Sequence, residues 1–163
     1  MKTQTILIPI LLIFSTFQID ATAWPSADRY FIDIVCLKKV PIIKATLNGK
    51  TAYFVLDSGS DVSIIHKLDA SDFAFTPKKR AIKSIIGVSG GNQSLHEVPD
   101  AVLQMAGHRL QTQFYATDLS TVVKALSIST GITVSGIIGV DLMRKYGFEI
   151  DYVGEKLFLD TDY

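Results

Sequence analysis

The stretch FVLDSGSDVSII, residues Phe54–Ile65, places a carboxylate and two small residues between two apolar runs. The apolar residues before the carboxylate are typical of a strand that enters a protein core, and those after Gly59 are typical of a chain that returns to it. We therefore expect the tripeptide Asp57-Ser58-Gly59 to lie at the end of a strand, facing any cleft that the fold provides.

The tripeptide itself has two interpretations. Aspartate supplies an ionisable group, serine a short hydroxyl, and glycine a backbone that a ligand can approach closely. Alternatively, Asp57 only shapes a tight turn and its carboxylate is solvated. The turn is favoured on the tripeptide alone, because short motifs often match by chance.

A second segment, IIGVDL at Ile137–Leu142, changes this balance. Together the two segments resemble the retropepsin-like family of aspartic proteases, the small relatives of retroviral protease. The family's first motif (two apolar residues, Asp, Thr or Ser, Gly, a small residue) is matched by Val55–Ser60, and its second by Ile137–Leu142. The tail at 146–159, YGFEIDYVGEKLFL, resembles the strand, turn and strand of bacterial members. The resemblance spans roughly Phe31–Leu159.

The resemblance implies an all-β fold, the closed β-barrel of retropepsin-like acid proteases with one or two short helices. The sequence itself agrees with an all-β class, because it consists of short β-rich runs separated by turn residues. Helices are expected only at Asp118–Leu126 and at Asp141–Tyr146, the second ended by Gly147. Hairpin turns are expected at Asn48-Gly49 and at Gly107-His108.

The implied activity is that of an aspartic endopeptidase with Asp57 as its catalytic residue, acting on a peptide or protein substrate. This chemistry needs two carboxylates that share one proton, so that one activates a water while the other polarises the scissile carbonyl. No second Asp-Thr/Ser-Gly follows in the sequence. We therefore expect a homodimer in which Asp57 faces its symmetry mate, with activity that favours acidic pH.

Other positions of the motifs carry weaker implied roles. Ser58 and Gly59 would support the active-site loop, Ser58 by hydrogen bonding across the dimer interface. Gly59 and Asp61 would bind the substrate main chain, although Asp61 could equally be a turn carboxylate. Some retroviral members have an arginine where this chain has Val140, so the partner of Asp61 is left open. For Asp141 we expect a helix cap rather than chemistry.

A glycine-rich segment, IIGVSGGNQSLHEV at Ile85–Val98, lies between the two motifs. Taken alone it predicts a surface hairpin, because glycine clusters mostly mark turns. In the resembling family this is the position of the flap, a hairpin that closes over bound peptide. The implied substrate-binding residues are Val88, Ser89 and Gly90.

Composition narrows the function further. The chain is 48% hydrophobic and 20% charged, which excludes a disordered or collagen-like protein, and its equal numbers of acids and bases argue against nucleic acid as a partner. The histidines His66, His96 and His108 are scattered, so we expect neither a metal nor another cofactor. Cys36 is the only cysteine, so it cannot form an intrachain disulfide. We expect its thiol to be buried in a strand rather than to act as a nucleophile.

The N-terminus has the three parts of a secretory signal: Lys2, the apolar run Ile6–Phe14, and the small-x-small sequence Ala21-Thr22-Ala23. We expect residues 1–23 to be a signal peptide and residues 24–163 to be the protease domain, exported to the periplasm or secreted. The apolar run is shorter than the roughly 20 residues that span a membrane. Membrane attachment is expected only if this signal stays uncleaved as an anchor.

One alternative from a different functional class stays open. The chain could be a non-catalytic binding module that keeps the retropepsin fold and uses its cleft for a peptide or a partner protein, because a fold does not fix an activity.

Overall fold

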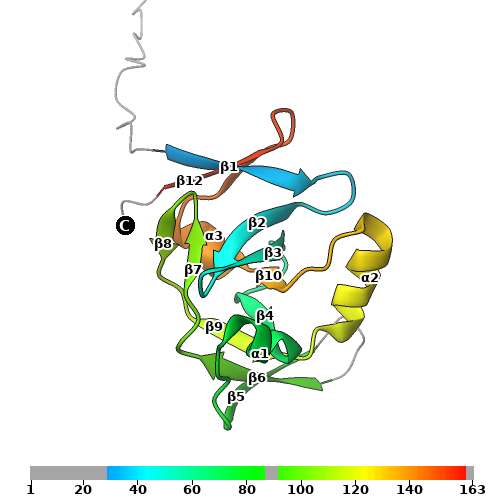
Figure 1. The fold of residues 1–163 in the computed structure, drawn as a ribbon, viewed down its shortest axis with the longest axis vertical. Helices are drawn as coiled ribbons and strands as arrows, with labels where there is room; N and C mark the ends of the chain where they lie inside the picture. The colour runs from blue at the N-terminus through cyan, green and yellow to red at the C-terminus, as the bar shows by residue number, and fades with distance from the viewer. Residues whose placement is uncertain (1–28, 87–91, 161–163) are drawn as a thin grey trace, which may run out of the picture.

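A computed structural model describes residues 29–86 and 92–160 (Figure 1). The expected signal peptide at 1–23 and the expected domain start at residue 24 lie outside these residues. Within them, no helix is both long enough and apolar enough to cross a membrane.

Short strands dominate the described chain, so the expected all-β class is confirmed. The strands are β1 (Arg29–Cys36), β2 (Ile42–Leu47), β3 (Lys50–Leu56), β4 (Ile64–His66), β5 (Ala81–Ile86), β6 (Asn92–Val98), β7 (Leu103–Met105), β8 (His108–Leu110), β9 (Phe114–Thr117), β10 (Gly136–Ile138), β11 (Glu149–Asp151) and β12 (Lys156–Asp160). The helices are α1 (Ala70–Phe73), α2 (Ser120–Thr130) and α3 (Val140–Lys145), with a 3₁₀ turn at Lys67–Asp69.

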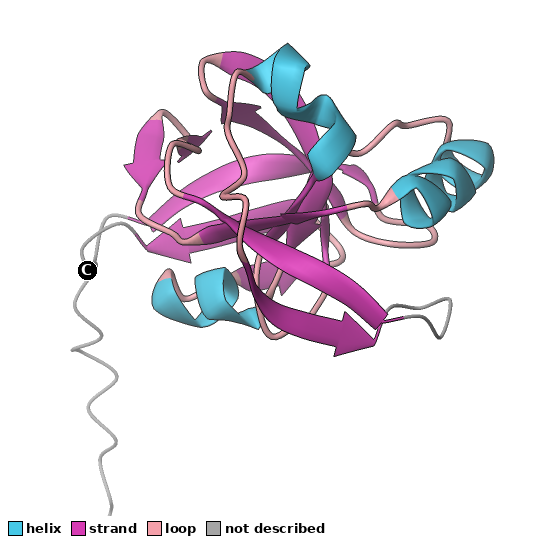
Figure 2. Cartoon of the chain, turned by 90° about the horizontal axis from the view of Figure 1, so that it is seen from below, coloured by secondary structure: helices cyan, strands magenta, loops and turns pink. Residues whose placement is uncertain are grey.

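The sheet is open, so the expectation of a closed barrel was wrong. Its strand order is β11-β12-β1-β2-β3-β10-β4-β9-β6-β5, and β11 and β5 are the two unjoined ends. The reason lies in the β5–β6 hairpin: only His96–Val98 of β6 pair with β9, and the rest of β6 pairs with β5 alone. The hairpin therefore extends from the body of the molecule, as Figure 2 shows, and does not return to β11.

At the centre of the sheet the two sequence motifs lie side by side. Strand β10 pairs in parallel with β3, with Val55 opposite Ile137, and antiparallel with β4. Phe54, Leu56 and Ile138 point into the main core, where each is at most 5% exposed. Val55 and Ile137 pack in a second apolar cluster, so both residues of each motif's apolar pair lie in apolar surroundings.

The first and last described strands, β1 and β12, are neighbours in the sheet. Strand β1 pairs antiparallel with β12, from Arg29 opposite Asp160 to Asp33 opposite Lys156, and its other edge pairs with β2. Leu157 and Leu159 of β12 are fully buried in the main core. Cys36 ends β1 and is half-buried, which is less burial than we expected.

The two expected hairpin turns had different outcomes. Asn48 and Gly49 have φ values of 47° and 80°, as a type I′ turn requires, and they join β2 to β3 as predicted. The second turn is displaced by one residue, to Ala106 and Gly107, with φ of 49° and 81°. His108 belongs to β8, because it forms the closing pair with Met105.

Both expected helices are present with shifted ends. Helix α2 starts two residues after Asp118, whose carboxylate accepts the N–H and hydroxyl of Ser120, and it continues four residues beyond Leu126 to Thr130. Gly131 ends it with φ of 75°. Helix α3 spans Val140–Lys145, whereas α1, a single turn, was not predicted.

Candidate active site

Asp57 follows the last residue of β3 and extends the pairing of that strand. Its N–H donates to the Ile138 carbonyl at 3.0 Å, which ties the catalytic candidate to the second motif. Its Oδ1 accepts the Gly59 N–H at 2.9 Å, and its carbonyl accepts the Ser60 N–H at 3.1 Å. The tripeptide is therefore a tight turn, as one of its two interpretations predicts, and its role as a reactive site stays a prediction.

Asp57, Ser58 and Gly59 are all exposed in the single chain. An aspartate that served only to shape the turn would need just one of its oxygens, and Oδ1 already accepts Gly59. Among the described residues, no hydrogen bond or ion pair involves Oδ2. The turn thus presents a carboxylate oxygen to solvent at the end of a buried strand.

The second motif is hydrogen-bonded to this loop. The Val140 N–H donates to the Ser60 carbonyl at 2.8 Å. Asp141 accepts the Ser63 hydroxyl at 2.8 Å through Oδ1 and the Ser63 N–H at 3.0 Å through Oδ2, and the Ser63 hydroxyl in turn accepts the Gly139 N–H at 3.1 Å. These hydrogen bonds join the start of α3 to the Asp57 loop.

The expected capping role of Asp141 was wrong. The N-cap of α3 is Gly139, and no side-chain hydrogen bond caps that helix end. Asp141 lies one residue inside the helix, and the bonds to Ser63 use both of its oxygens. Ser63 is fully buried, and we had not predicted it as a site residue.

Gly139 lies against the backbone of the loop. A Cβ atom on Gly139 would be 2.5 Å from the Val62 carbonyl oxygen and 2.7 Å from that of Ser60. Its φ of −92° is available to any residue, so glycine is required for space and not for backbone conformation.

Of the remaining predicted substrate-binding residues, only Asp61 is among the described residues. Asp61 is exposed beside the loop, and in the described chain its carboxylate has no hydrogen bond or ion pair. Val88, Ser89 and Gly90 lie outside the described residues. The strands on either side of them are paired up to Ile86 and Asn92, so the expected hairpin stem is present.

An apolar row crosses the sheet on the same face as Asp57. Paired residues of five adjacent strands form it, in the order Ile42, Val55, Ile137, Ile64 and Tyr115. Because side chains alternate along a strand, Asp57 projects to the face of Val55, opposite the main core. Three members of the row are buried, whereas Ile137 and Tyr115 are half-buried. The carboxylate thus stands at the edge of an apolar floor.

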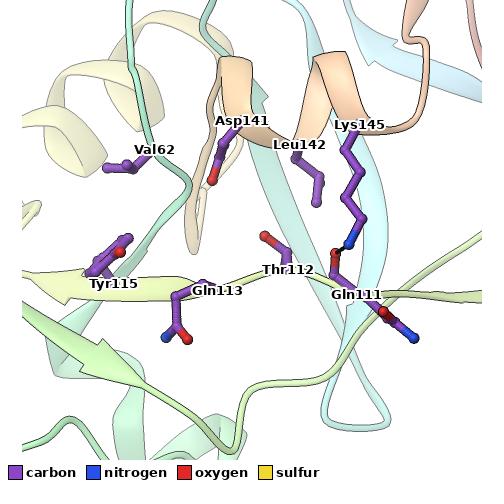
Figure 3. A pocket seen from close by; sticks show the side chains of 8 residues that line it. All are labelled: Val62, Gln111, Thr112, Gln113, Tyr115, Asp141, Leu142 and Lys145. Carbon is purple, nitrogen blue, oxygen red and sulfur yellow. Dashed lines mark hydrogen bonds between the residues drawn. The ribbon is translucent and has the colours of Figure 1, made fainter. Parts of the chain in front are cut away.

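A pocket of about 310 Å³ lies between α3 and the segment that leads into β9 (Figure 3). Its lining residues are Val62, Gln111, Thr112, Gln113, Tyr115, Asp141, Leu142 and Lys145. The Asp141 side chain points toward it, and Lys145 Nζ donates to the Gln111 carbonyl at 2.8 Å across its rim. Since Asp57 is not among the lining residues, this pocket is separate from the candidate catalytic carboxylate.

Asp69, at the end of the 3₁₀ turn, and Asp118, two residues before α2, have shifted pKa values. Burial raises the pKa of Asp69, partly offset by the nearby His66 and Ser135. Hydrogen bonds from Ser120 lower the pKa of Asp118. His66 is 6% exposed, and its Nδ1 accepts the Leu119 N–H at 3.0 Å, so it holds the segment that enters α2.

No group of three or more His, Cys, Asp or Glu side chains in the described parts of the chain is arranged to hold a metal ion. Sequence reasoning singled out Asp57 as a candidate but did not identify Ser63 or the apolar row. Strand alternation could have revealed the row, whereas no local signal marks Ser63 as the partner of Asp141.

Comparison with known proteins gives a consistent result. A family model described as "Aspartyl protease" matches residues 43–142, a range that contains both motifs. The protease of EIAV in complex with the inhibitor HBY-793 is 21% identical, with a TM-score of 0.53 over 71% of this chain and 95% of that one. A retropepsin-like aspartic protease from Rickettsia conorii is 17% identical, with a TM-score of 0.55 over 81% of this chain and 89% of that one. The retroviral protease-like domain of Ddi1 from Leishmania major is 20% identical, with a TM-score of 0.53 over 75% of this chain and 89% of that one.

Proposed function

The chain belongs to the retropepsin-like aspartyl protease family, and from this membership we propose that it is an aspartic endopeptidase that works as a homodimer. The observation that carries the proposal is the exposed Asp57 turn, held at the end of β3 by hydrogen bonds to the second motif. A carboxylate fixed in position and open to solvent is what general acid–base chemistry requires.

The homodimer follows from the number of such turns. Each chain supplies one Asp-Ser-Gly sequence, and its Asp57, Ser58 and Gly59 are uncovered by the rest of the protomer. A twofold axis beside this turn would bring two Asp57 carboxylates together and bury both loops. Ser58 would then bond across the interface.

The proposed reaction uses the two carboxylates in different protonation states. One, ionised, takes a proton from water, whose oxygen attacks the scissile carbonyl carbon. The other, protonated, hydrogen-bonds to the carbonyl oxygen, and two such close carboxylates share one proton because both cannot ionise together. Transfer of a proton to the leaving nitrogen then accompanies cleavage of the C–N bond.

An extended peptide would lie on the apolar row, with Asp61 near its main chain. The β5–β6 hairpin, through Val88, Ser89 and Gly90, would cover its other side. We also propose export of the chain by residues 1–23.

The decisive experiment compares Asp57→Asn with the unmutated chain in a peptide-library digestion across acidic and neutral pH. We expect cleavage by the unmutated protein, inhibition by a statine-type compound, and a loss of about 10²–10⁴-fold in Asp57→Asn. Asp72→Asn is the matched control, because Asp72 is an exposed aspartate of α1 and not of the Asp57 loop.

Two results would contradict the proposal. Full activity in Asp57→Asn would exclude the carboxylate as the catalyst. A strict monomer in sedimentation at acidic pH, with peptide binding but no cleavage, would instead support the non-catalytic binding module.

A further inference from the structure

His66 ends β4 in a buried position and holds the residue from which α2 starts. It is 6% exposed, and its Nδ1 accepts the Leu119 N–H at 3.0 Å. A neutral imidazole accepts a hydrogen bond at one ring nitrogen only, so the ring proton lies on Nε2. The Leu119 carbonyl accepts the Val123 N–H at 2.9 Å. The first turn of α2 therefore depends on a residue that a histidine side chain holds in place.

The hydrogen bond to Leu119 exists only while His66 is neutral. An imidazolium ion has an N–H donor on both ring nitrogens and no acceptor. Protonated His66 would therefore turn a second donor toward the Leu119 N–H, and the two donors would repel. Histidine is also the side chain whose charge ordinarily changes between about pH 5 and pH 8. Acidification can thus break this contact.

Two carboxylates lie near His66. Asp69 of the 3₁₀ turn and Asp118 before α2 are both close enough to interact with an imidazolium charge. Lys67, the next residue along the chain, is the neighbouring cation and is exposed. Strand β10 has no titratable side chain, and the one in β9, Tyr115, does not pair with His66. Attraction to the two carboxylates offsets part of the cost of a buried charge.

Leu119 extends the effect beyond α2. Its side chain is 6% exposed and forms one buried cluster with Ile64 of the apolar row and Leu95 of β6. Release of the Leu119 backbone would therefore loosen the packing of α2 against both β4 and β6.

From this geometry we propose that His66 is a pH-sensitive switch: neutral His66 holds Leu119, and protonation as the pH falls releases the start of α2. The His66 N–H donates to the Ser135 carbonyl at 2.7 Å, so the backbone of β4 stays paired while the side chain loses its partner. The switch does not depend on peptidase activity. A peptidase that favours acidic pH would work with the start of α2 released.

Hydrogen exchange of the full chain, followed by NMR at about pH 7.5 and about pH 5, tests the switch. The measured quantity is the protection factor of the Leu119 amide, which removes the pH dependence of chemical exchange itself. The reference is the Asn48 N–H, which donates to the Val102 carbonyl at 2.9 Å, because neither of these groups titrates. We expect the Leu119 protection factor to fall about tenfold relative to that of Asn48 on acidification, as for the loss of one hydrogen bond.

Two variants assign the response to His66. His66→Gln keeps an acceptor for the Leu119 N–H but does not titrate, so the ratio of the two protection factors should be the same at both pH values. His108→Gln is the matched control, because His108 lies on β8 and its ring contacts Tyr30 at a centroid distance of 3.9 Å. It should keep the full pH response.

Three results would overturn the proposal. The first is a ratio that does not change between the two pH values in the unmutated chain. The second is a response that persists in His66→Gln or disappears in His108→Gln, because another group would then cause it. The third needs no variant: nitrogen NMR of the unmutated chain would show the His66 ring still neutral at the pH where Leu119 loses its protection.

Discussion

Replacing Gly139 with alanine should displace the Asp57 loop and so lower the proposed peptidase activity, although Gly139 lies outside the Asp57-Ser58-Gly59 tripeptide. The new Cβ would start 2.5 Å from the Val62 carbonyl oxygen and 2.7 Å from the Ser60 carbonyl oxygen, whereas real Cβ atoms are essentially never closer than 3.0 Å to such atoms. Both oxygens belong to backbone, so no side chain can rotate away. The loop must retreat by about half an ångström or α3 must shift.

Two effects follow, one on stability and one on activity. Overpacking of this kind lowers the free energy of unfolding by about 1–3 kcal/mol. A displacement of about 1 Å at a catalytic group lowers the rate by about a hundredfold, so we expect kcat/KM to fall by about ten- to a hundredfold. In free energy the two effects are of similar size, because a ten- to hundredfold loss of kcat/KM corresponds to about 1.4–2.7 kcal/mol.

Gly131→Ala is the control that separates these effects. Gly131 has φ of 75° and open space around its Cα, so alanine there is strained without a clash. It should lower stability by about 1–2 kcal/mol and leave activity per folded molecule unchanged. Urea unfolding at one fixed protomer concentration and peptide cleavage measure the two quantities.

The reasoning is refuted if Gly139→Ala cleaves peptides as fast as the unmutated chain and loses no more stability than Gly131→Ala. That result would mean that the start of α3 and the Asp57 loop can shift independently of each other.

Three more measurements test the surroundings of the site. Asp141→Ala should lower the free energy of unfolding by about 2–4 kcal/mol in urea, because Ser63 loses two charge-assisted bonds, and Asp141→Asn should recover part of this. The lowered pKa of Asp118 means that its stabilisation is present above its unfolded pKa and is lost as pH falls through the folded pKa. Asp118→Asn should therefore destabilise near neutral pH and have almost no effect at about pH 2. His66→Phe should leave the Leu119 N–H without its acceptor, at a stability loss of about 1–3 kcal/mol, and speed its hydrogen exchange.

Local features were predictable from the sequence because their causes are local. Asn48-Gly49 forms its turn because both residues accept positive φ, and the first motif ends a strand because apolar residues stop at Asp57. The later end of α2 was missed because Ile128 and Thr130 are weak helix formers, and the helix stops only where Gly131 takes a left-handed conformation.

Distant relationships were not predictable in the same way. Asp141 was assigned to its own helix because sequence reasoning sees only near neighbours, yet its partner Ser63 is 78 residues away. The open sheet was missed for a related reason, since the path of the β5–β6 hairpin depends on which half of β6 meets β9.

The pairing of β1 with β12 sets an order of events for folding. Strand β1 lies between β2 and β12, and the residue pair Arg29 and Asp160 closes a loop that contains nearly the whole described chain. Closing so long a loop is entropically unfavourable until other contacts have formed, so this step should be late and slow. A nascent chain therefore carries an unsatisfied edge on β1 until the last strand has been synthesised, and truncation before Leu157 would leave that edge open to other chains.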